Sequence, residues 1–308
     1  MLIVTSYENP DIDCIACSVG YAELKNKLGI PTKAVYWGNY SLEVEFVKNF
    51  CKAFPVEKDT GKYTPHDEIV LVDTSATHLI NPRISAEQVI EIYDHRELTQ
   101  SEGFPAAKTY IDLVGSCSTL ITELFQKDNL IPSPVSAIYL YSGIISNTVN
   151  FRGQVTTQRD ITAANWLKSL INLPGNYVES MFKTKSKLDS SNISGIIKDD
   201  FAVREFAGRR IGIAQIEVTD LENLLKKLKA EILKTLEEQR TEYSLDFVFF
   251  TGIDILNGFN VFIAADDKSK AIFSEALGIK LNRGGTKADL VMLRKQIWPK
   301  VKKLLEKK

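Results

Sequence analysis

Residues 1–13 read MLIVTSYENPDID, and this stretch decides how the rest of the first half is interpreted. The run LIVTS (2–6) is apolar and β-branched, which is typical of a buried strand, and an Asn-Pro pair ends it. Apolar side chains then recur at helical spacing over 13–28 and stop before Gly29. A strand that leads at once into a helix is the repeating unit of an open α/β sheet.

The same alternation continues through the first half of the chain. Nearly continuous apolar runs, which suit parallel strands buried on both faces, lie at 33–37, 68–73, 89–94 and 109–114. Helices are expected near 116–128, 134–148 and 157–171. We therefore predict an α/β protein whose N-terminal domain is a mostly parallel open sheet with flanking helices.

The polar segment TKSKLDSSN (184–192) is the expected linker to a second domain. Strands are expected after it at 201–207, 210–218, 245–250 and 260–265. A long helix is expected at 220–242, with Thr219 and Glu222 as a capping box, and packing on a sheet is favoured over a coiled coil. The sequence thus predicts one domain at 1–183 and a smaller, mixed α/β domain at 193–308.

Charge and composition exclude several classes of protein. The 308 residues carry 38 Lys and Arg against 39 Asp and Glu, a net charge of -1, so no overall basic field favours nucleic acid. The start of the chain lacks a basic leader, and no run of about 18 apolar residues occurs, so neither a signal peptide nor a membrane span is expected. Four cysteines with a single CxxC (Cys14, Cys17) favour reduced thiols in a cytoplasmic protein.

Carboxylates follow three of the predicted strands. Asp11 and Asp13 come after the first, Asp73 closes another, and Asp94 with His95 closes a third. Because ligands of open α/β sheets gather at the carboxyl ends of strands, these groups are expected in one crevice, where their charges repel. One or two divalent cations would remove the repulsion, and this ligand set suits Mn²⁺ or Mg²⁺. The alternative is that each aspartate is a turn residue or helix cap, which we favour for one aspartate alone but not for the set.

Four short motifs, NPDID, VDTS, YDHR and GSCSTLI, stand in the order and spacing of the DHH phosphoesterases. The second half, with GRRIGIAQIEV (208–218) and MLRKQIWP (292–299), resembles the accessory domain called DHHA2. The chain is thus similar to the DHH/DHHA2 superfamily, above all to family II manganese-dependent inorganic pyrophosphatases and to exopolyphosphatase and prune-type relatives. The resemblance implies metal ions between the domains that activate a bridging water, and a homodimer built through the first domain.

The resemblance assigns roles to residues one by one. Asp11, Asp13, Asp73 and His95 match metal ligands, and Asp94 matches the first Asp of the DHH motif, which would orient His95.

Two ligand positions depart from the pyrophosphatase pattern. Tyr7 stands in place of a histidine, and Asn147 stands in place of an aspartate. We keep Asn147 as a ligand candidate through its carbonyl oxygen, and we expect both changes to weaken metal binding.

The DHH motif itself reads DHR here, as in prune-type proteins, with Arg96 at its end. A guanidinium beside the metals could grip phosphate oxygens in a fork. An ion pair with Glu97 or Glu102 is the equally weighted alternative.

In the second domain, Ala202 stands where the pyrophosphatases have a lysine, and Arg204, which shares its face of the strand, is the expected replacement. The substrate-binding Arg-Lys pair of the family falls on Leu293 and Arg294, and Lys295 matches a following lysine. The alternative for Arg294 and Lys295 is a solvated basic face.

Ser116 lies in the turn that opens the helix expected near 116–128. The exposed N–H groups of such a turn can receive an anion, so Ser116 is a substrate-binding candidate, and a plain tight turn is the alternative.

These assignments favour a metal-dependent phosphoanhydride hydrolase that acts on pyrophosphate or short polyphosphate. The alternative is a catalytically weakened regulatory protein that binds phosphate or nucleotide on the same scaffold, suggested by the departures at Tyr7, Asn147, Ala202 and Leu293. A nuclease-like activity ranks last, because residues 283–286 only faintly resemble the G-G-G-H segment of those relatives and lack the histidine.

Overall fold

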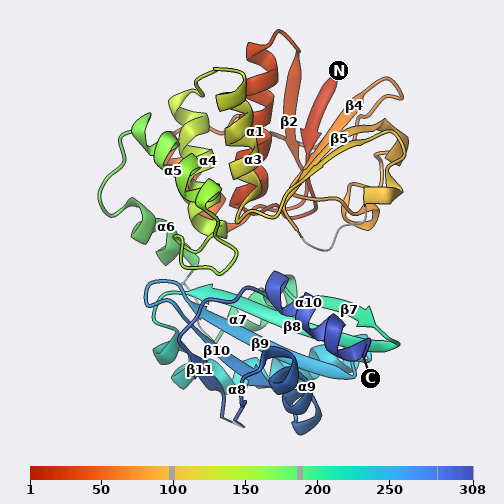
Figure 1. The fold of residues 1–308 in the computed structure, drawn as a ribbon, viewed down its shortest axis with the longest axis vertical. Helices are drawn as coiled ribbons and strands as arrows, with labels where there is room; N and C mark the ends of the chain where they lie inside the picture. Colours follow the sequence, from red (N-terminus) through yellow and green to blue (C-terminus); the bar gives the residue numbers. More distant parts are fainter. Residues whose placement is uncertain (97–100, 186–189, 283, 308) are drawn as a thin grey trace. The chain divides into compact units, whose positions relative to one another are not determined.

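The computed structural model describes residues 1–96, 101–185, 190–282 and 284–307 (Figure 1). The chain divides into an N-terminal unit, Met1–Phe151 with Val155–Met181, and a C-terminal unit, Arg152–Gln154 with Phe182–Lys308. Of the expected linker, 186–189 lie outside the described residues.

The N-terminal unit is built on six parallel strands in the order β3-β2-β1-β4-β5-β6. The strands are β1 (Leu2–Thr5), β2 (Thr32–Tyr36), β3 (Glu57–Lys58), β4 (Glu68–Val72), β5 (Val89–Asp94) and β6 (Lys108–Ile111). The predicted parallel sheet is confirmed, and only the two-residue, exposed edge strand β3 had no signal in the sequence.

Helices cover one face of this sheet and short turns cover the other. The helices are α1 (Ile12–Lys27), α2 (Leu42–Cys51), α3 (Cys117–Lys127), α4 (Pro134–Asn147), α5 (Gln158–Ser169) and α6 (Tyr177–Lys185). Figure 1 shows α1, α3, α4 and α5 together on one side of the strands. On the opposite face Ile80, Ile84 and Phe104 pack in one cluster with Ile69 and Leu71 of β4. This layering leaves the carboxyl ends of β1, β4 and β5 side by side, where the order of strands reverses.

The C-terminal unit has five strands in the order β11-β10-β9-β8-β7, of which only β8 and β9 are parallel. They are β7 (Ala202–Phe206), β8 (Arg209–Val218), β9 (Phe247–Asp254), β10 (Phe259–Ala264) and β11 (Thr286–Ala288). The helices are α7 (Ile193–Asp199), α8 (Leu221–Tyr243), α9 (Asp267–Leu277) and α10 (Arg294–Leu305). The mixed α/β domain is therefore confirmed.

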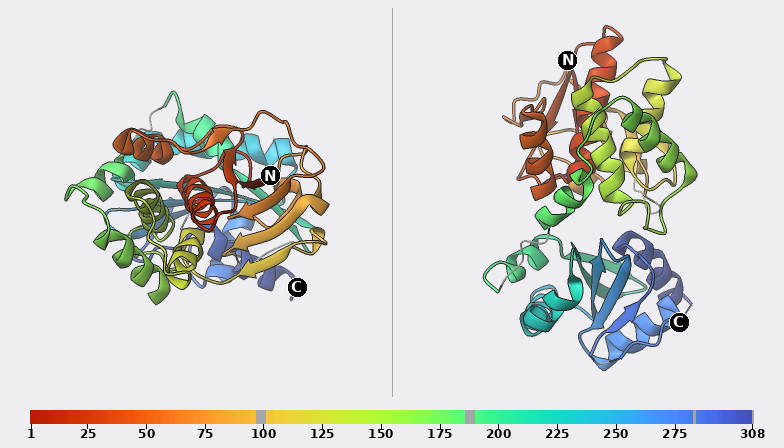
Figure 2. Two further views of the ribbon diagram at one scale, coloured as in Figure 1. Left: turned by 90° about the horizontal axis from the view of Figure 1, so that it is seen from above. Right: turned by 90° about the vertical axis from the view of Figure 1, so that its left-hand side faces the viewer.

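Two helix layers enclose the second sheet, as the right view of Figure 2 shows with α8 on one side and α9 and α10 on the other. Ile232 and Leu236 of α8 pack in one cluster with Val248 and Phe250 of β9, so the long helix packs on the sheet as predicted. On the other face Phe273 of α9 stacks on Phe249, with ring centroids 3.9 Å apart. No helix in the described part of the chain combines the length and the apolar character needed to cross a membrane.

The predicted capping box of the long helix is wrong. The N-cap of α8 is Asp220, which has a positive φ of 62° and makes no side-chain capping bond. The N–H of Leu221 donates instead to Oδ2 of Asp254 at 2.9 Å, a carboxylate from the end of β9. A distant side chain thus replaces the local cap, which no local pattern around Thr219 and Glu222 can reveal.

Candidate metal centre

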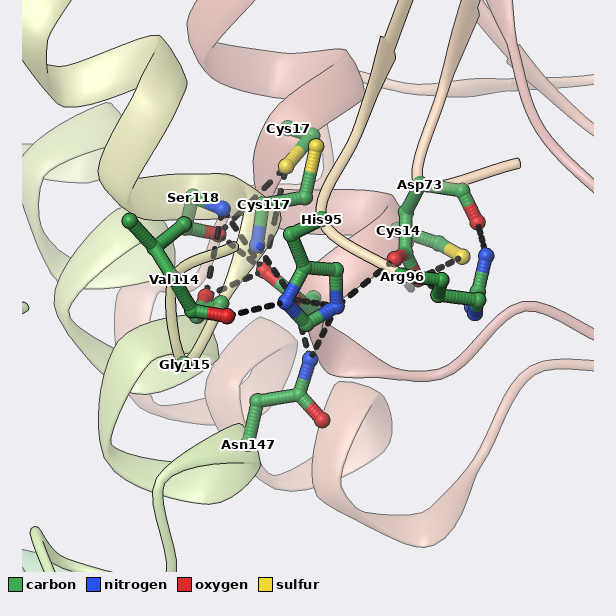
Figure 3. Close-up of polar contacts among 12 residues, drawn as sticks. Cys14, Cys17, Asp73, His95, Arg96, Val114, Gly115, Cys117, Ser118 and Asn147 are labelled. Carbon is green, nitrogen blue, oxygen red and sulfur yellow. Dashed lines mark hydrogen bonds and ion pairs between the residues drawn. The ribbon is translucent and has the colours of Figure 1, made fainter. Parts of the chain in front are cut away.

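The predicted acidic residues lie together at the carboxyl ends of β1, β4 and β5. Asp11 is the N-cap of α1, Asp13 lies in the first turn of that helix, and Asp73 follows β4 directly. His95 follows β5, and its Nε2 atom lies 3.2 Å from Oδ1 of Asp73 and 3.9 Å from Oδ2 of Asp13 (Figure 3). Two groups of ligand atoms each fall within 4.8 Å and share Asp73: Asp13 with His95, and Asp11 with Cys14.

The carboxylate of Asp13 is held by the start of α3. Its Oδ1 accepts from the hydroxyl of Ser116 at 2.7 Å and from the N–H of Ser118 at 2.9 Å, and its Oδ2 accepts from the N–H of Cys117 at 2.9 Å. The helix start therefore does receive an anion, as its exposed N–H groups allow, but the anion is this aspartate. Ser116 is fully buried and committed to Asp13, so the expectation of a substrate-facing hydroxyl is corrected.

Asp73 differs because one of its oxygens has no donor. Its Oδ2 accepts from the Cys14 thiol at 3.2 Å and lies 3.2 Å from Nη2 of Arg96. Its Oδ1 is buried and has no hydrogen-bond partner among the described residues. Burial alone would raise the pKa of Asp73, but the adjacent guanidinium of Arg96 outweighs burial and holds that pKa well below its usual range. The result is a buried carboxylate oxygen that faces Nε2 of His95 and has no hydrogen-bond donor among the described residues.

Asp73 also has a strained backbone. Its φ is 54°, in the left-handed region that non-glycine residues rarely adopt, and its N–H donates to the carbonyl of Tyr93 at 2.8 Å. Such strain persists only where surrounding contacts fix it, and it occurs mainly at functional sites.

The imidazole of His95 is oriented by a carbonyl group. Its Nδ1 lies 2.9 Å from the oxygen of Val114, which can only accept, so Nδ1 carries the proton and Nε2 of the neutral ring keeps its lone pair toward Asp73. This pairing of one ring nitrogen is characteristic of histidine ligands. Asp94 does not contact the ring: it accepts from the backbone N–H of His95 at 2.7 Å and from Ser75 at 2.6 Å. The expected orienting role of Asp94 therefore acts through the backbone of the turn.

Asp13, Asp73 and His95 fit a divalent cation. Two carboxylates and an imidazole are a ligand set that Mn²⁺ accepts, and the unpartnered Oδ1 of Asp73 is a ligand atom already aimed at the other two residues. Asp11 also experiences repulsion from the neighbouring carboxylates, since burial and the charges of Asp73 and Asp13 raise its pKa to about 7.

Arg96 and Tyr7, which both depart from the pyrophosphatase pattern, contact each other. The guanidinium carbon of Arg96 lies 5.5 Å from the centroid of the Tyr7 ring, and Nη1 lies 3.3 Å from Oδ1 of Asp94. Arg96 forms ion pairs with Asp73 and Asp94, and its expected grip on phosphate oxygens stays a prediction. Of the two glutamates considered, Glu97 lies outside the described residues.

Asn147 presents its nitrogen to the cluster. Its Nδ2 donates to Oδ2 of Asp13 and lies 3.4 Å from Nε2 of His95, while its oxygen points away in Figure 3. In this arrangement the carbonyl oxygen of Asn147 does not face the cluster, because the amide nitrogen donates a hydrogen bond to Asp13. Beyond this residue, Val149, Asn150 and Phe151 all have positive φ values, of 52°, 51° and 65°. Consecutive left-handed residues are costly and mark the end of α4 as strained.

Several residues of the centre had no assigned role in the sequence. Cys14 donates to Asp73, and Cys17 lies 3.5 Å from the hydroxyl of Ser118, so the CxxC of α1 places one thiol on Asp73 and the other beside the helix start that holds Asp13. Gly143 of α4 is also required, because a Cβ there would lie 2.4 Å from the Ser118 hydroxyl and 3.1 Å from Oδ1 of Asp13. Only the spacing of Cys14 and Cys17 from the acidic pair could have indicated this.

The predicted basic residues of the C-terminal unit lie along the start of α10 and on β7. Arg294 forms a fork with Asp200, with Nη2 to Oδ1 at 2.9 Å and Nη1 to Oδ2 at 3.2 Å. It is the first residue of α10, and 19% of its side chain is exposed. Arg204 lies over the ring of Trp298, 5.7 Å from its centroid, and Lys295 follows Arg294 on α10.

Family models match both parts of the chain. Residues 1–144 match the DHH family, N-terminal domain, and residues 179–304 match the DHHA2 domain. The N-terminal part of the chain therefore matches the DHH family and the C-terminal part matches DHHA2, which confirms the resemblance found in the motifs.

Named relatives are similar over nearly the whole chain. It is 26% identical over 310 residues to a "probable manganese-dependent inorganic pyrophosphatase" of Clostridium acetobutylicum, covering 100% of this chain and 99% of the relative. A protein of the same description from Bacillus cereus is 26% identical over 300 residues, covering 97% and 96%. Among solved structures, a putative family II inorganic pyrophosphatase of Methanococcus jannaschii superposes with a TM-score of 0.81 at 28% identity, covering 99% and 100%. An exopolyphosphatase-related protein of Bacteroides fragilis, at a TM-score of 0.51 and 13% identity over 99% and 92%, shares the fold.

Proposed function

We propose that this protein hydrolyses inorganic pyrophosphate or short polyphosphate with the help of Mn²⁺ or Mg²⁺. The observation that carries the proposal is the buried, unpartnered Oδ1 of Asp73, which faces Nε2 of His95 beside Asp13. The relatives named manganese-dependent inorganic pyrophosphatases support both the metal and the substrate class.

Asp13, Asp73 and His95 would hold the cation. When bound, such a cation lowers the pKa of a coordinated water and neutralises charge on phosphate oxygens. The chain supplies the rigidity: Val114 fixes the tautomer of His95, and the start of α3 fixes Asp13. Ligands held in this way need no reorganisation when the cation arrives.

The contribution of the second domain is also part of the proposal. We assign Arg204, Arg294 and Lys295 to the phosphate groups, with the reaction taking place between the two units. The fork that Arg294 forms with the carboxylate of Asp200 supports this role, because phosphate oxygens offer the same paired acceptors. A cytoplasmic homodimer built through the first domain completes the proposal, and light scattering of the purified protein tests the dimer.

A regulatory phosphate- or nucleotide-binding protein is the second candidate. It is favoured by the amide of Asn147, which donates to Asp13, and by Tyr7, which packs against Arg96 and offers no imidazole. Such a protein would bind the same anions without turnover.

Phosphate release separates the two candidates. We expect Mn²⁺-dependent release from pyrophosphate and tripolyphosphate, less from nucleoside triphosphates, and none from the Asp73→Asn variant. Asp254→Asn, which alters a buried strand-end aspartate of the C-terminal unit, is the matched control and should keep its activity. Calorimetric binding of pyrophosphate without any release of phosphate would establish the regulatory alternative instead.

A further inference from the structure

We propose that the guanidinium of Arg96 takes the place of one divalent cation, so that the chain holds a single cation at Asp13, Asp73 and His95. Two groups of ligand atoms share Asp73, and they therefore define two candidate cation positions on either side of that carboxylate. The inference rests on the proposed function, because the remaining cation is the one used there.

The two oxygens of Asp73 are not equivalent. Oδ1 is buried, lacks a hydrogen-bond donor among the described residues and lies 3.2 Å from Nε2 of His95. Oδ2 accepts from the Cys14 thiol and contacts Nη2 of Arg96, each at 3.2 Å. A cation between Asp11, Cys14 and Asp73 would lie beside the thiol that donates to Oδ2, and Arg96 already contacts that oxygen.

Contacts with three residues hold the guanidinium of Arg96 in place. Nη1 donates to the carbonyl of Asp73 and lies 3.3 Å from Oδ1 of Asp94. The Arg96 guanidinium lies against the ring of Tyr7, so the aromatic face of residue 7 contacts the guanidinium in a cation–π interaction. Arginine suits this position because its planar guanidinium group stays positively charged at every pH at which proteins are normally folded. It also loses its hydration more readily than an ammonium group does.

The charges of the cluster also favour a single bound cation. The cluster contains four carboxylates, from Asp11, Asp13, Asp73 and Asp94, and Arg96 offsets one of them. One divalent cation leaves a single uncompensated negative charge. A second would leave an excess of positive charge beside a guanidinium that cannot give up its proton.

The experiment counts Mn²⁺ on the full chain without measuring turnover. Equilibrium dialysis gives the number of ions per chain, and electron paramagnetic resonance distinguishes an isolated ion, with six resolved lines, from a coupled pair. We expect one isolated Mn²⁺ in the wild type. We expect two coupled ions in the double variant Tyr7→His with Arg96→His, which vacates Oδ2 and supplies an imidazole. The matched control Arg96→Lys keeps the positive charge and should still bind one.

Two tightly bound ions in the wild type would overturn the inference, whatever the variants do. A folded double variant that still binds one ion would also overturn it, with folding checked by circular dichroism. Neither result touches the proposed function, which fails separately if the wild type binds no Mn²⁺ and releases no phosphate from pyrophosphate.

Discussion

Two buried aspartates at strand ends, Asp73 after β4 and Asp254 at the end of β9, differ in their hydrogen-bond partners. Asp254 accepts from the N–H of Leu221 at 2.9 Å with one oxygen and from the N–H of Asn257 at 2.8 Å with the other. Asp73 has an oxygen with no donor among the described residues.

This difference distinguishes a structural carboxylate from a candidate metal ligand. A buried carboxylate whose oxygens are saturated by backbone N–H groups has no need of a cation, since its charge is already stabilised. In the N-terminal unit the helix start that could have played this part, that of α3, is occupied by Asp13. Oδ1 of Asp73 is left without a hydrogen-bond donor among the described residues.

The largest effect is expected for Asp73→Asn. Losing this ligand should weaken Mn²⁺ binding by more than about 100-fold, because loss of an outer-shell partner alone costs 10–100-fold. Isothermal titration calorimetry measures the affinity, with Asp254→Asn as the control that keeps it. Equal affinities in the wild type and Asp73→Asn would remove the distinction between the two aspartates.

The converse change, Asp254→Ala, should lower stability and leave Mn²⁺ affinity unaltered. It removes the cap of α8 and leaves the buried N–H of Leu221 without its acceptor, for a combined loss of about 3 kcal/mol in the free energy of unfolding. Urea denaturation followed by circular dichroism measures the loss. Asp254→Asn, which retains one acceptor oxygen, should lie between the variant and the wild type.

Arg96→Ala tests how much the positive charge of Arg96 stabilises the carboxylate of Asp73. In the metal-free protein it leaves a buried carboxylate with less compensation, at a cost of about 2 kcal/mol, below the range for fully buried pairs because the Arg96 side chain is 28% exposed. Added Mn²⁺ should restore most of this stability, since an ion can replace the guanidinium. Arg204→Ala is the control, and any deficit that it has should persist with Mn²⁺.

The smallest effect is expected at a third carboxylate beyond a strand end, Asp266, which caps α9. Burial would raise its pKa, but Arg240 and Ser269 outweigh burial and lower that pKa. Since the folded-state pKa lies below the unfolded value, the stability gained is full above pH of about 4 and is lost as pH falls through the folded value. Asp266→Asn should therefore cost about 1 kcal/mol near pH 7, and the difference should vanish toward pH 2. A difference that stays constant with pH would show that its charge contributes nothing.

Sequence by itself determined the parallel sheet, the mixed second sheet and the convergence of Asp11, Asp13, Asp73 and His95. Strand and helix periodicity is a local property, and the carboxyl ends of neighbouring parallel strands must meet at one edge. The DHH and DHHA2 motifs could be identified for the same reason, since short runs of fixed spacing carry them.

Tertiary structure alone decided which partner each side chain has. Asp13 is held by α3, Asp254 replaces the expected cap of α8, and Arg96 pairs with Asp73, all across long separations in sequence. Ser116 turned inward for the same reason. A hydrogen bond forms only when the donor–acceptor distance is correct to within a few tenths of an ångström. The elements that carry these donors and acceptors come together only in the folded chain, so no local pattern encodes the pairing.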